Sequence, residues 1–312
     1  MAPPVSLGIA LDDSPSAFGE LRDSTSALGD SAELERRLDD DGYLWIRSLL
    51  DLEWVLDARR QVVEWLAAQG NLDAGRPIMD AYAAPNATTA FTAEERRFPL
   101  VRRLLHTGRL IEFYAKLLGG EIRALDYIWM RLMSPGQASG PHCDIVYMNR
   151  GTTKLYTSWV PLGAVPRESG PLIVMERSHR LTDLRDGYGR MDIDEGRNWT
   201  KLRFRHGRLF RGGDYSRNPR AVQRQFGLRW LTADFAAGDV VMLSVYTLHG
   251  SLDNLSDRIR LSVDGRYQLA SEAADERWVG EHPAGHSEGQ SRMLRARRWR
   301  RGHARQAAAT RT

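Results

Sequence analysis

The spacing of apolar residues changes at about residue 121, and this change constrains the fold more than any other feature of the sequence. Upstream of it, residues 31–38, 51–69 and 98–118 carry apolar side chains at helical intervals. Downstream, short apolar runs rich in β-branched and aromatic residues alternate with Gly and Pro turns. The sequence therefore predicts a mainly β fold with flanking helices, in which a β-sandwich or jelly roll is covered by an N-terminal helical layer.

Composition along the chain predicts one domain over residues 31–290, with its jelly-roll core at about 121–270. Residues 1–30 are rich in Ser, Asp, Gly and Pro and have weak periodicity, which indicates a loose N-terminal arm. Residues 180–230 form a long insert rich in Arg, Gly and aromatic residues, and we interpret it as a lid or substrate loop. Residues 291–312 form a basic tail, which we expect to be a frayed and solvated end.

The overall composition argues against several classes of protein. Cys143 is the single cysteine, so no internal disulfide is possible, which fits a reducing compartment. No apolar run is long enough to span a bilayer, and Met1–Ala10 lacks the pattern of a secretion signal, so we expect a cytoplasmic protein. The net charge of +4 is small, and nothing outside the basic tail resembles a nucleic-acid module. The expected partner is a small molecule, with neither nucleic acid nor a membrane.

The strongest chemical signal is His142-Cys-Asp144, followed far downstream by His249 at the end of an apolar run. Residues two apart on an extended chain point to the same side, so His142 and Asp144 can bind one metal together. His249 would then supply a third ligand from a neighbouring strand. Two imidazoles and one carboxylate form the facial triad of non-haem iron(II) oxygenases, which leaves positions open for co-substrate and dioxygen. The alternative is that these residues form two unrelated polar clusters.

A second signal follows His249 by 11 and 13 residues, at Arg260 and Ser262. Apolar residues alternate with polar ones there, so one strand face would carry Arg260 and Ser262 together. If that face lines a barrel interior, the buried guanidinium needs an anion, and a dicarboxylate can supply two parallel hydrogen bonds. The alternative is a solvated strand face on which Asp264 and Arg266 are neighbours.

These residues lie in blocks that resemble the phytanoyl-CoA dioxygenase (PhyH-like) family of Fe(II)/2-oxoglutarate oxygenases. The blocks occur in the order and spacing of that family between about residues 125 and 268. They are Pro141-His-Cys-Asp-Ile-Val-Tyr-Met, Thr157-Ser-Trp-Val-Pro-Leu-Gly, Glu168-Ser-Gly-Pro-Leu-Ile-Val-Met with Ser178-His-Arg, and Gly238-Asp-Val-Val through His249-Gly to Arg260-Leu-Ser. The resemblance implies a double-stranded β-helix, the cupin-like jelly roll, with flanking helices.

The resemblance also implies roles for individual residues. It implies iron ligation by His142, Asp144 and His249. It implies that Arg260 pairs with the distal carboxylate of 2-oxoglutarate with help from Ser262. Trp159 matches a tryptophan that lines the co-substrate pocket in relatives, and Arg131 is a further candidate for contact with co-substrate or substrate. Because position 144 is aspartate, not the glycine or alanine of related halogenases, halogenation is not expected.

The predicted activity is hydroxylation of an unactivated C–H bond in a small molecule, such as a secondary metabolite. Fe(II), 2-oxoglutarate and O2 are the expected cofactor and co-substrates, and succinate and CO2 the expected by-products. Trp129, Tyr147 and Thr157 are candidate substrate residues, although core packing is the favoured interpretation of Trp129 and Tyr147. The arginine-rich insert favours a polar or anionic group on the substrate. Desaturation or ring formation at the same site, a non-catalytic cupin-like binding protein, and a Zn(II) hydrolase or isomerase stay open as alternatives.

Overall fold

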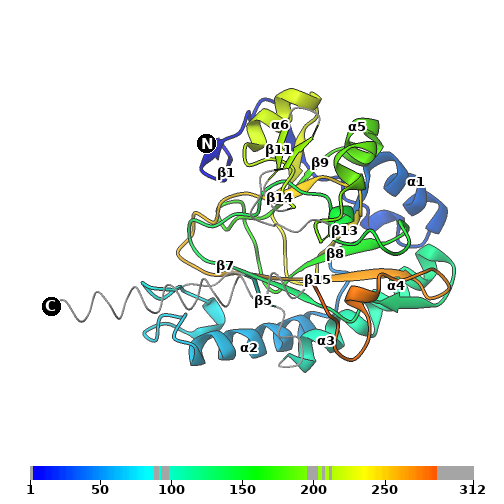
Figure 1. Ribbon diagram of the computed structural model, residues 1–312. Helices are drawn as coiled ribbons and strands as arrows, with labels where there is room; N and C mark the ends of the chain where they lie inside the picture. Colours follow the sequence, from blue (N-terminus) through cyan, green and yellow to red (C-terminus); the bar gives the residue numbers. More distant parts are fainter. Residues whose placement is uncertain are drawn as a thin grey trace.

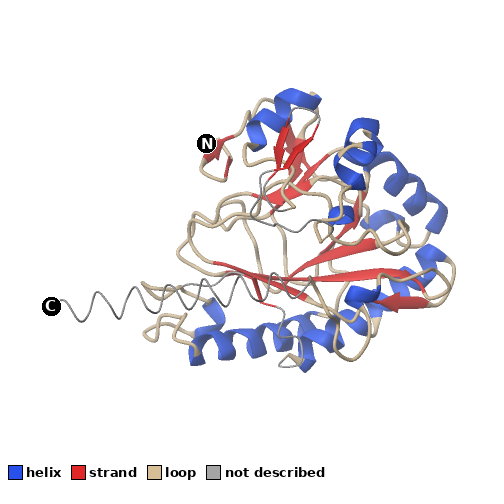
Figure 2. Ribbon diagram, viewed as in Figure 1, coloured by secondary structure: helices blue, strands red, loops and turns tan. Residues whose placement is uncertain are grey.

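The computed structural model describes residues 3–87, 91–92, 98–194, 203–205, 208–210 and 213–286. In these residues two β-sheets pack against each other, and helices cover the outer face of the larger sheet (Figures 1 and 2). Between the sheets, Trp159 and Val241 of the larger sheet belong to the same apolar cluster as Val174 and Leu231 of the smaller sheet. This arrangement confirms the predicted jelly-roll core with flanking helices.

The larger sheet has seven strands, and each strand runs antiparallel to its neighbours. In spatial order they are β4 (Tyr43–Ile46), β13 (Val240–Ser244), β8 (Tyr156–Pro161), β15 (Arg260–Leu269), β7 (Trp129–Met133) and β5 (Phe91–Thr92), with β6 (Ile122–Ala124) also paired to β15. The long strand β15 therefore lies near the middle of the sheet, where both of its edges are paired.

The smaller sheet has four strands and carries the far side of the sandwich. Its order is β14 (His249–Ser251), β9 (Leu172–Met175), β12 (Trp230–Thr232) and β3 (Phe18–Glu20). Only the β12–β3 pair is parallel; the other neighbours in this sheet are antiparallel. The short strand β14 places His249 at one edge of this sheet.

The predicted N-terminal helical layer is present and packs on the larger sheet. Its four helices are α1 (Ser31–Asp41), α2 (Leu52–Ala68), α3 (Pro99–His106) and α4 (Arg109–Leu118). Their apolar faces share one core cluster with residues of β4, β7, β8, β13 and β15. The remaining described helices, several of them single 3-10 turns, are η1 (Thr25–Ala27), η2 (Ile78–Asp80), η4 (Asp144–Val146), η5 (Ser178–Arg180), α5 (Thr182–Asp186), η6 (Tyr188–Arg190), α6 (Pro219–Phe226) and η7 (Glu276–Trp278).

Strand β15 has two faces of opposite character, as its alternating sequence predicted. Leu261 and Val263 pack into the core under the helices. The polar residues at even positions point the other way, into the sandwich, yet they are as buried as the apolar ones. Arg260, Asp264 and Arg266 are only 4%, 2% and 1% exposed. The alternative of a solvated strand face is therefore wrong, because this face of β15 points into the sandwich and is covered there.

The N-terminal arm differs from its prediction. Residues 3–30 are not loose: they contain the hairpin of β1 (Val5–Ser6) and β2 (Ile9–Ala10), then β3 and η1. The backbone N–H groups of Leu7 and Gly8 donate to the carboxylate of Asp253, and strand β3 pairs with β12. A Ser-, Asp- and Gly-rich segment looked irregular in isolation because its hydrogen-bond partners lie more than 200 residues away in the chain.

Two other predicted segments lie partly or wholly outside the described residues. Within the predicted insert at 180–230, residues 195–202, 206–207 and 211–212 lie outside the described residues. The whole of the basic tail predicted at 291–312 and residues 287–290 before it also lie outside them. The described part of the insert holds α5, η6, α6 and the short hairpin of β10 (Arg203–Arg205) and β11 (Arg208–Phe210). Its role as a lid or substrate loop stays a prediction. No helix in the described part of the chain is both long and apolar enough to traverse a bilayer.

The core under the helices offers a test of this packing. Leu66 on α2 is fully buried, whereas Leu52 at the start of the same helix is 54% exposed. We expect Leu66→Ala to lower the free energy of unfolding by about 2–5 kcal/mol, because it leaves a cavity in the core. Leu52→Ala, a matched change at the surface, should alter it by less than about 0.5 kcal/mol. Urea unfolding followed by circular dichroism measures both, and equal effects would contradict the assigned packing.

Candidate metal centre

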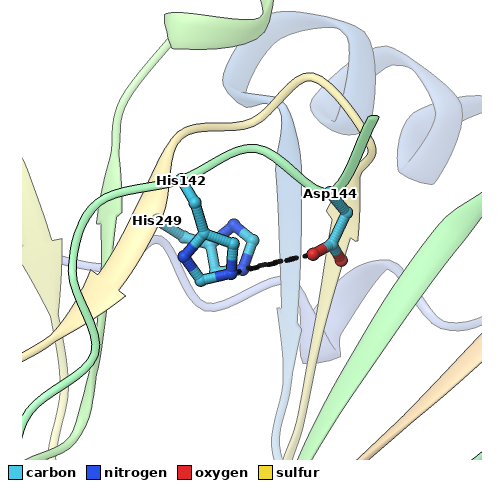
Figure 3. Close-up of side chains that lie close together, drawn as sticks. All are labelled: His142, Asp144 and His249. Atoms are coloured by element: carbon cyan, nitrogen blue, oxygen red, sulfur yellow. Dashed lines mark ion pairs between the residues drawn. The ribbon is translucent and has the colours of Figure 1, made fainter. Parts of the chain in front are cut away.

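The side chains of the three predicted ligands lie close together in the folded chain (Figure 3). His142 lies in the loop after β7, and Asp144 begins η4 two residues later. His249 is the first residue of β14, and its backbone exchanges two hydrogen bonds with that of His142, at 2.9 and 3.0 Å. This small antiparallel bridge brings two residues 107 positions apart into fixed register.

The geometry of the three side chains suits a single metal ion. The Oδ1 atom of Asp144 lies 3.8 Å from Nε2 of His142 and 3.9 Å from Nε2 of His249. Both separations are shorter than twice a typical metal–ligand bond of about 2.1 Å, so one ion can contact both atoms of each pair. All three residues are buried, and their ligand atoms lie within 4.8 Å of one another. The alternative of two unrelated polar clusters is therefore excluded by position.

Hydrogen bonds from the backbone orient both imidazoles. Nδ1 of His142 lies 2.8 Å from the carbonyl oxygen of Gly140, and Nδ1 of His249 lies 3.0 Å from that of Thr247. Because a carbonyl only accepts, each Nδ1 carries the proton and each Nε2 presents its lone pair toward Asp144. Burial lowers the pKa of His142 to about 4, with a further contribution from His249, and burial also lowers the pKa of His249. Both imidazoles are thus neutral near pH 7, as metal ligation requires.

Asp144 is held through its other carboxylate oxygen. Oδ2 accepts hydrogen bonds from the hydroxyl of Thr157 and, at 3.1 Å, from Nη2 of Arg266. Burial alone would raise the pKa of Asp144, but the Arg266 guanidinium and the two imidazoles together hold it well below its usual value. With Oδ2 engaged by two donors, Oδ1 is the oxygen presented to a metal. The hydroxyl of Thr157 thus positions the carboxylate, and its predicted role as a substrate residue stays a prediction.

A narrow cavity leads from the histidines to Arg260. His142, His249, Thr157, Trp159, Arg131 and Arg260 are among the residues that line it. Nη1 of Arg260 donates to the hydroxyl of Ser262 at 2.5 Å, and its guanidinium carbon lies 5.8 Å from the centre of the Trp159 ring. Among the described residues no carboxylate pairs with Arg260, and its buried Nε has no hydrogen-bond partner. Burial, together with nearby Arg131, lowers the pKa of Arg260 to about 9, which an anion in the cavity would reverse.

A wider chamber opens on the other side of the same ligands. Its lining includes the metal-site residues His142 and Asp144, two of the predicted substrate residues, Trp129 and Tyr147, and the polar side chains Arg131, Asp214, Arg217, Arg266 and His286. The Tyr147 ring lies edge-on to His142, with centroids 5.7 Å apart. Arg131 lines both the cavity and the chamber, and its Nε donates to Asp264 at 2.6 Å. His142 and Arg131 therefore border both a narrow cavity that contains Arg260 and a larger space open to the outside.

Residues 38–262 match the phytanoyl-CoA dioxygenase (PhyH) family. The chain belongs to this family. It is therefore an Fe(II)- and 2-oxoglutarate-dependent oxygenase, an oxidoreductase that uses O2, and hydroxylation is the reaction that its relatives support. It is 25% identical over 262 residues to a 1-deoxypentalenic acid 11-beta-hydroxylase of Streptomyces exfoliatus, an alignment that covers 80% of this chain and 85% of the relative.

Solved structures share the fold of this PhyH-family oxygenase. The epimerase SnoN in complex with Fe3+, alpha ketoglutarate and nogalamycin RO superposes with a TM-score of 0.53 at 21% identity, covering 81% of this chain and 94% of SnoN. EctD from S. alaskensis with 2-oxoglutarate and 5-hydroxyectoine superposes with a TM-score of 0.56 at 19% identity, covering 91% and 88%. At these identities the likeness concerns the fold.

The sequence did not indicate several residues of this oxygenase site. Arg266 and Asp264 continue the inward face of β15 beyond Ser262, so the two-residue period that identified Arg260 could have found them. Leu7, Arg217 and His286 line the chamber from distant parts of the chain and carry no local signal. His179, a histidine near the matched blocks, is not part of the site: its Nε2 lies 2.8 Å from the carbonyl oxygen of Asp39.

The contact between Thr157 and Asp144 gives a prediction for metal affinity. We expect Thr157→Val to weaken Fe(II) or Co(II) binding by about 10–100-fold, because groups that orient metal ligands contribute on that scale. Thr232→Val is the matched control, since it also removes a buried hydroxyl, one that donates to Leu172 in the smaller sheet. Anaerobic metal titration measures both variants. Equal metal affinity in the two would show that Thr157 does not position Asp144.

Proposed function

We propose that His142, Asp144 and His249 hold Fe(II), and that Arg260 with Ser262 binds the distal carboxylate of 2-oxoglutarate. The observation that carries the proposal is the buried Arg260 guanidinium, which has no carboxylate partner among the described residues and lies in the cavity that begins at the ligand set. A protein that bound only a metal would have no use for this cation. A buried charge without a partner is costly, so its retention favours a diacid as the regular occupant of the cavity.

Iron and 2-oxoglutarate together supply the oxidising power toward C–H bonds that amino-acid side chains lack. The chain's own residues supply geometry and a dry site. The two neutral imidazoles and one carboxylate oxygen would hold the metal, and a set of three protein ligands would leave coordination positions for the co-substrates. Trp159 walls the co-substrate cavity, and Arg266 with Thr157 keeps the second oxygen of Asp144 occupied. The burial of all three ligands excludes bulk water from this side.

The substrate is proposed to enter the wider chamber, where Trp129 and Tyr147 face the metal site. The chamber adjoins an outer pocket, and the two share Leu7, Arg131, Ala138, Ser139 and Arg217, which we call the neck. The neck carries two guanidinium groups: Arg131 is held by Asp264, whereas the exposed Arg217 is paired with the chamber residue Asp214 at 3.4 Å, a contact for which an anionic group on the substrate would compete. The hydroxylase relative acts on a compound named as an acid, 1-deoxypentalenic acid. We therefore propose a small apolar carboxylic acid as the substrate class and a cytoplasmic enzyme, and we place hydroxylation ahead of desaturation or ring formation.

The assignment of Arg260 is tested by the dependence of turnover on 2-oxoglutarate. We expect Arg260→Gln to raise the KM for 2-oxoglutarate by about 10–100-fold, because a hydrogen bond to a charged group contributes about 1.5–3 kcal/mol. Arg258→Gln is the control, since Arg258 is exposed and two residues away on the same segment. Succinate formation that requires Fe(II) measures both variants. A wild-type protein that forms no succinate with Fe(II) and 2-oxoglutarate, or an unchanged KM in Arg260→Gln, contradicts the proposal.

The proposed substrate charge is tested with two probes of equal shape, adamantane-1-carboxylate and adamantane-1-carboxamide. With Mn(II) and 2-oxoglutarate bound, we expect the carboxylate to bind more tightly. Arg217→Gln should reduce that preference about fivefold, the effect of losing an exposed ion pair of about 1 kcal/mol. Arg224→Gln, on the exposed side of α6, should leave it unchanged. Isothermal titration at two salt concentrations measures the preference, and equal affinity for both probes in the wild type would exclude an anion site in the neck.

A further inference from the structure

We propose that the N-terminal hairpin, residues 5–10, is a fixed wall of the substrate entrance and that Leu7 at its turn determines which apolar skeletons are accepted. This inference rests on the proposed function, since it concerns the same chamber. Leu7 lines both the chamber next to the metal centre and the outer pocket. It lies outside residues 38–262, the segment that matches the PhyH family. The part of the entrance that Leu7 forms is therefore a feature of this chain and not of the matched core.

The hairpin is attached to the strand that carries a metal ligand. The carboxylate of Asp253 accepts the Leu7 N–H at 2.6 Å through one oxygen and the Gly8 N–H at 2.8 Å through the other. The Asp253 N–H in turn donates to the carbonyl oxygen of Val5 at 2.8 Å. The Ser6 hydroxyl donates to the carbonyl oxygen of Ser251 at 2.7 Å. Ser251 ends β14, which begins at His249. These bonds fix the position of the turn relative to His249. The side chain of Leu7 therefore lines the entrance at a fixed distance from the metal centre.

The backbone at Leu7 indicates why a leucine is present. Its φ of 55° lies in the left-handed region, where a residue with a side chain is disfavoured and glycine is not. A leucine could offset this cost by packing in the core, but Leu7 belongs to none of the apolar clusters formed by the described residues. Its half-buried side chain faces the channel instead. Backbone outliers of this kind that persist without a packing role are typical of functional sites.

The surroundings of Leu7 define the chemistry of the ligand. Tyr127, Trp129 and Tyr147 supply aromatic surface to the same chamber, while Arg131 and Arg217 share the neck with Leu7. Arg131 cannot shift easily, because its Nε is bound to the buried Asp264. A ligand that reaches the metal centre thus passes a leucine beside two guanidinium groups, of which the exposed Arg217 is paired with Asp214 at 3.4 Å. An apolar ring skeleton that carries one carboxylate fits this arrangement, with its skeleton against Leu7 and its charge toward the arginines.

Leu7→Gly tests the proposal without disturbing the fold, since glycine adopts the left-handed turn without strain. With the full chain bound to Mn(II) and 2-oxoglutarate, we expect Leu7→Gly to bind adamantane-1-carboxylate about tenfold more weakly than the wild type, as expected for losing part of a leucine's apolar contact. Its affinity for acetate, which has no skeleton to contact Leu7, should not change. Leu7→Met, which keeps an apolar side chain of similar length, should retain most of the wild-type affinity.

The control is Arg177→Gly, which also removes a side chain at positive φ, 54°, but an exposed one at a position that lines neither pocket. It should bind adamantane-1-carboxylate like the wild type. Wild-type affinity in Leu7→Gly, or a wild type that binds adamantane-1-carboxylate no better than acetate, would overturn the proposal. The affinity for 2-oxoglutarate, measured in the same titrations, separates the two hypotheses. A wild type that does not bind 2-oxoglutarate would contradict the proposed function. A change in the affinity for adamantane-1-carboxylate alone, with 2-oxoglutarate binding unchanged, bears only on the role of Leu7.

Discussion

The buried contact between Arg266 and Asp144 is the interaction on which the rest of the site depends. A carboxylate this deep in the protein would be protonated if nothing stabilised its charge, and it would then be a poor metal ligand. Arg266 supplies the compensating charge at 3.1 Å, and its guanidinium lies 4.0 Å from the centre of the Trp129 ring, which fixes its plane. Strand β15 therefore contributes to the metal centre through Arg266 and to the co-substrate cavity through Arg260, from the same inward face.

The balance of buried charge explains why the site calls for both an anionic co-substrate and an anionic substrate. Three guanidinium groups, those of Arg131, Arg260 and Arg266, meet two carboxylates, those of Asp144 and Asp264. One positive charge is left over, and it lies on Arg260. A divalent metal adds two more, and a bound dicarboxylate removes two. The occupied site would then retain one positive charge next to the chamber, to which the paired Arg217 and Asp214 add no net charge, so a singly charged anion would complete neutrality.

Sequence reasoning found the parts of this site that local spacing encodes. His142 and Asp144 are two residues apart, and Arg260 and Ser262 share a strand face, so both pairs could be read from periodicity. The change of period at about residue 121 indicated where most of the strands begin, but it missed β3 and β5, short upstream strands that complete the two sheets. The N-terminal hairpin was missed for the opposite reason. Its stability comes from Asp253 and Ser251, nearly 250 residues away, and a composition rich in Ser, Asp and Gly is the same whether or not such partners exist.

The residues that could be predicted from the sequence lie on paired strands or next to them, and those that could not lie on segments added around them. The metal ligands and Arg260 lie on strands or on loops bonded to strands, where register fixes them relative to one another. The chamber lining also includes residues far from these strands in the sequence, Leu7 and His286, and His286 contacts Asp194 and the ring of Trp278. Arg277 anchors this part of the lining through three carboxylates, those of Asp192, Asp194 and Asp275. The bonds that hold the hairpin involve the backbone of Leu7 and not its side chain, so the side chain that meets the substrate can change while the backbone bonded to the strand of His249 stays in place.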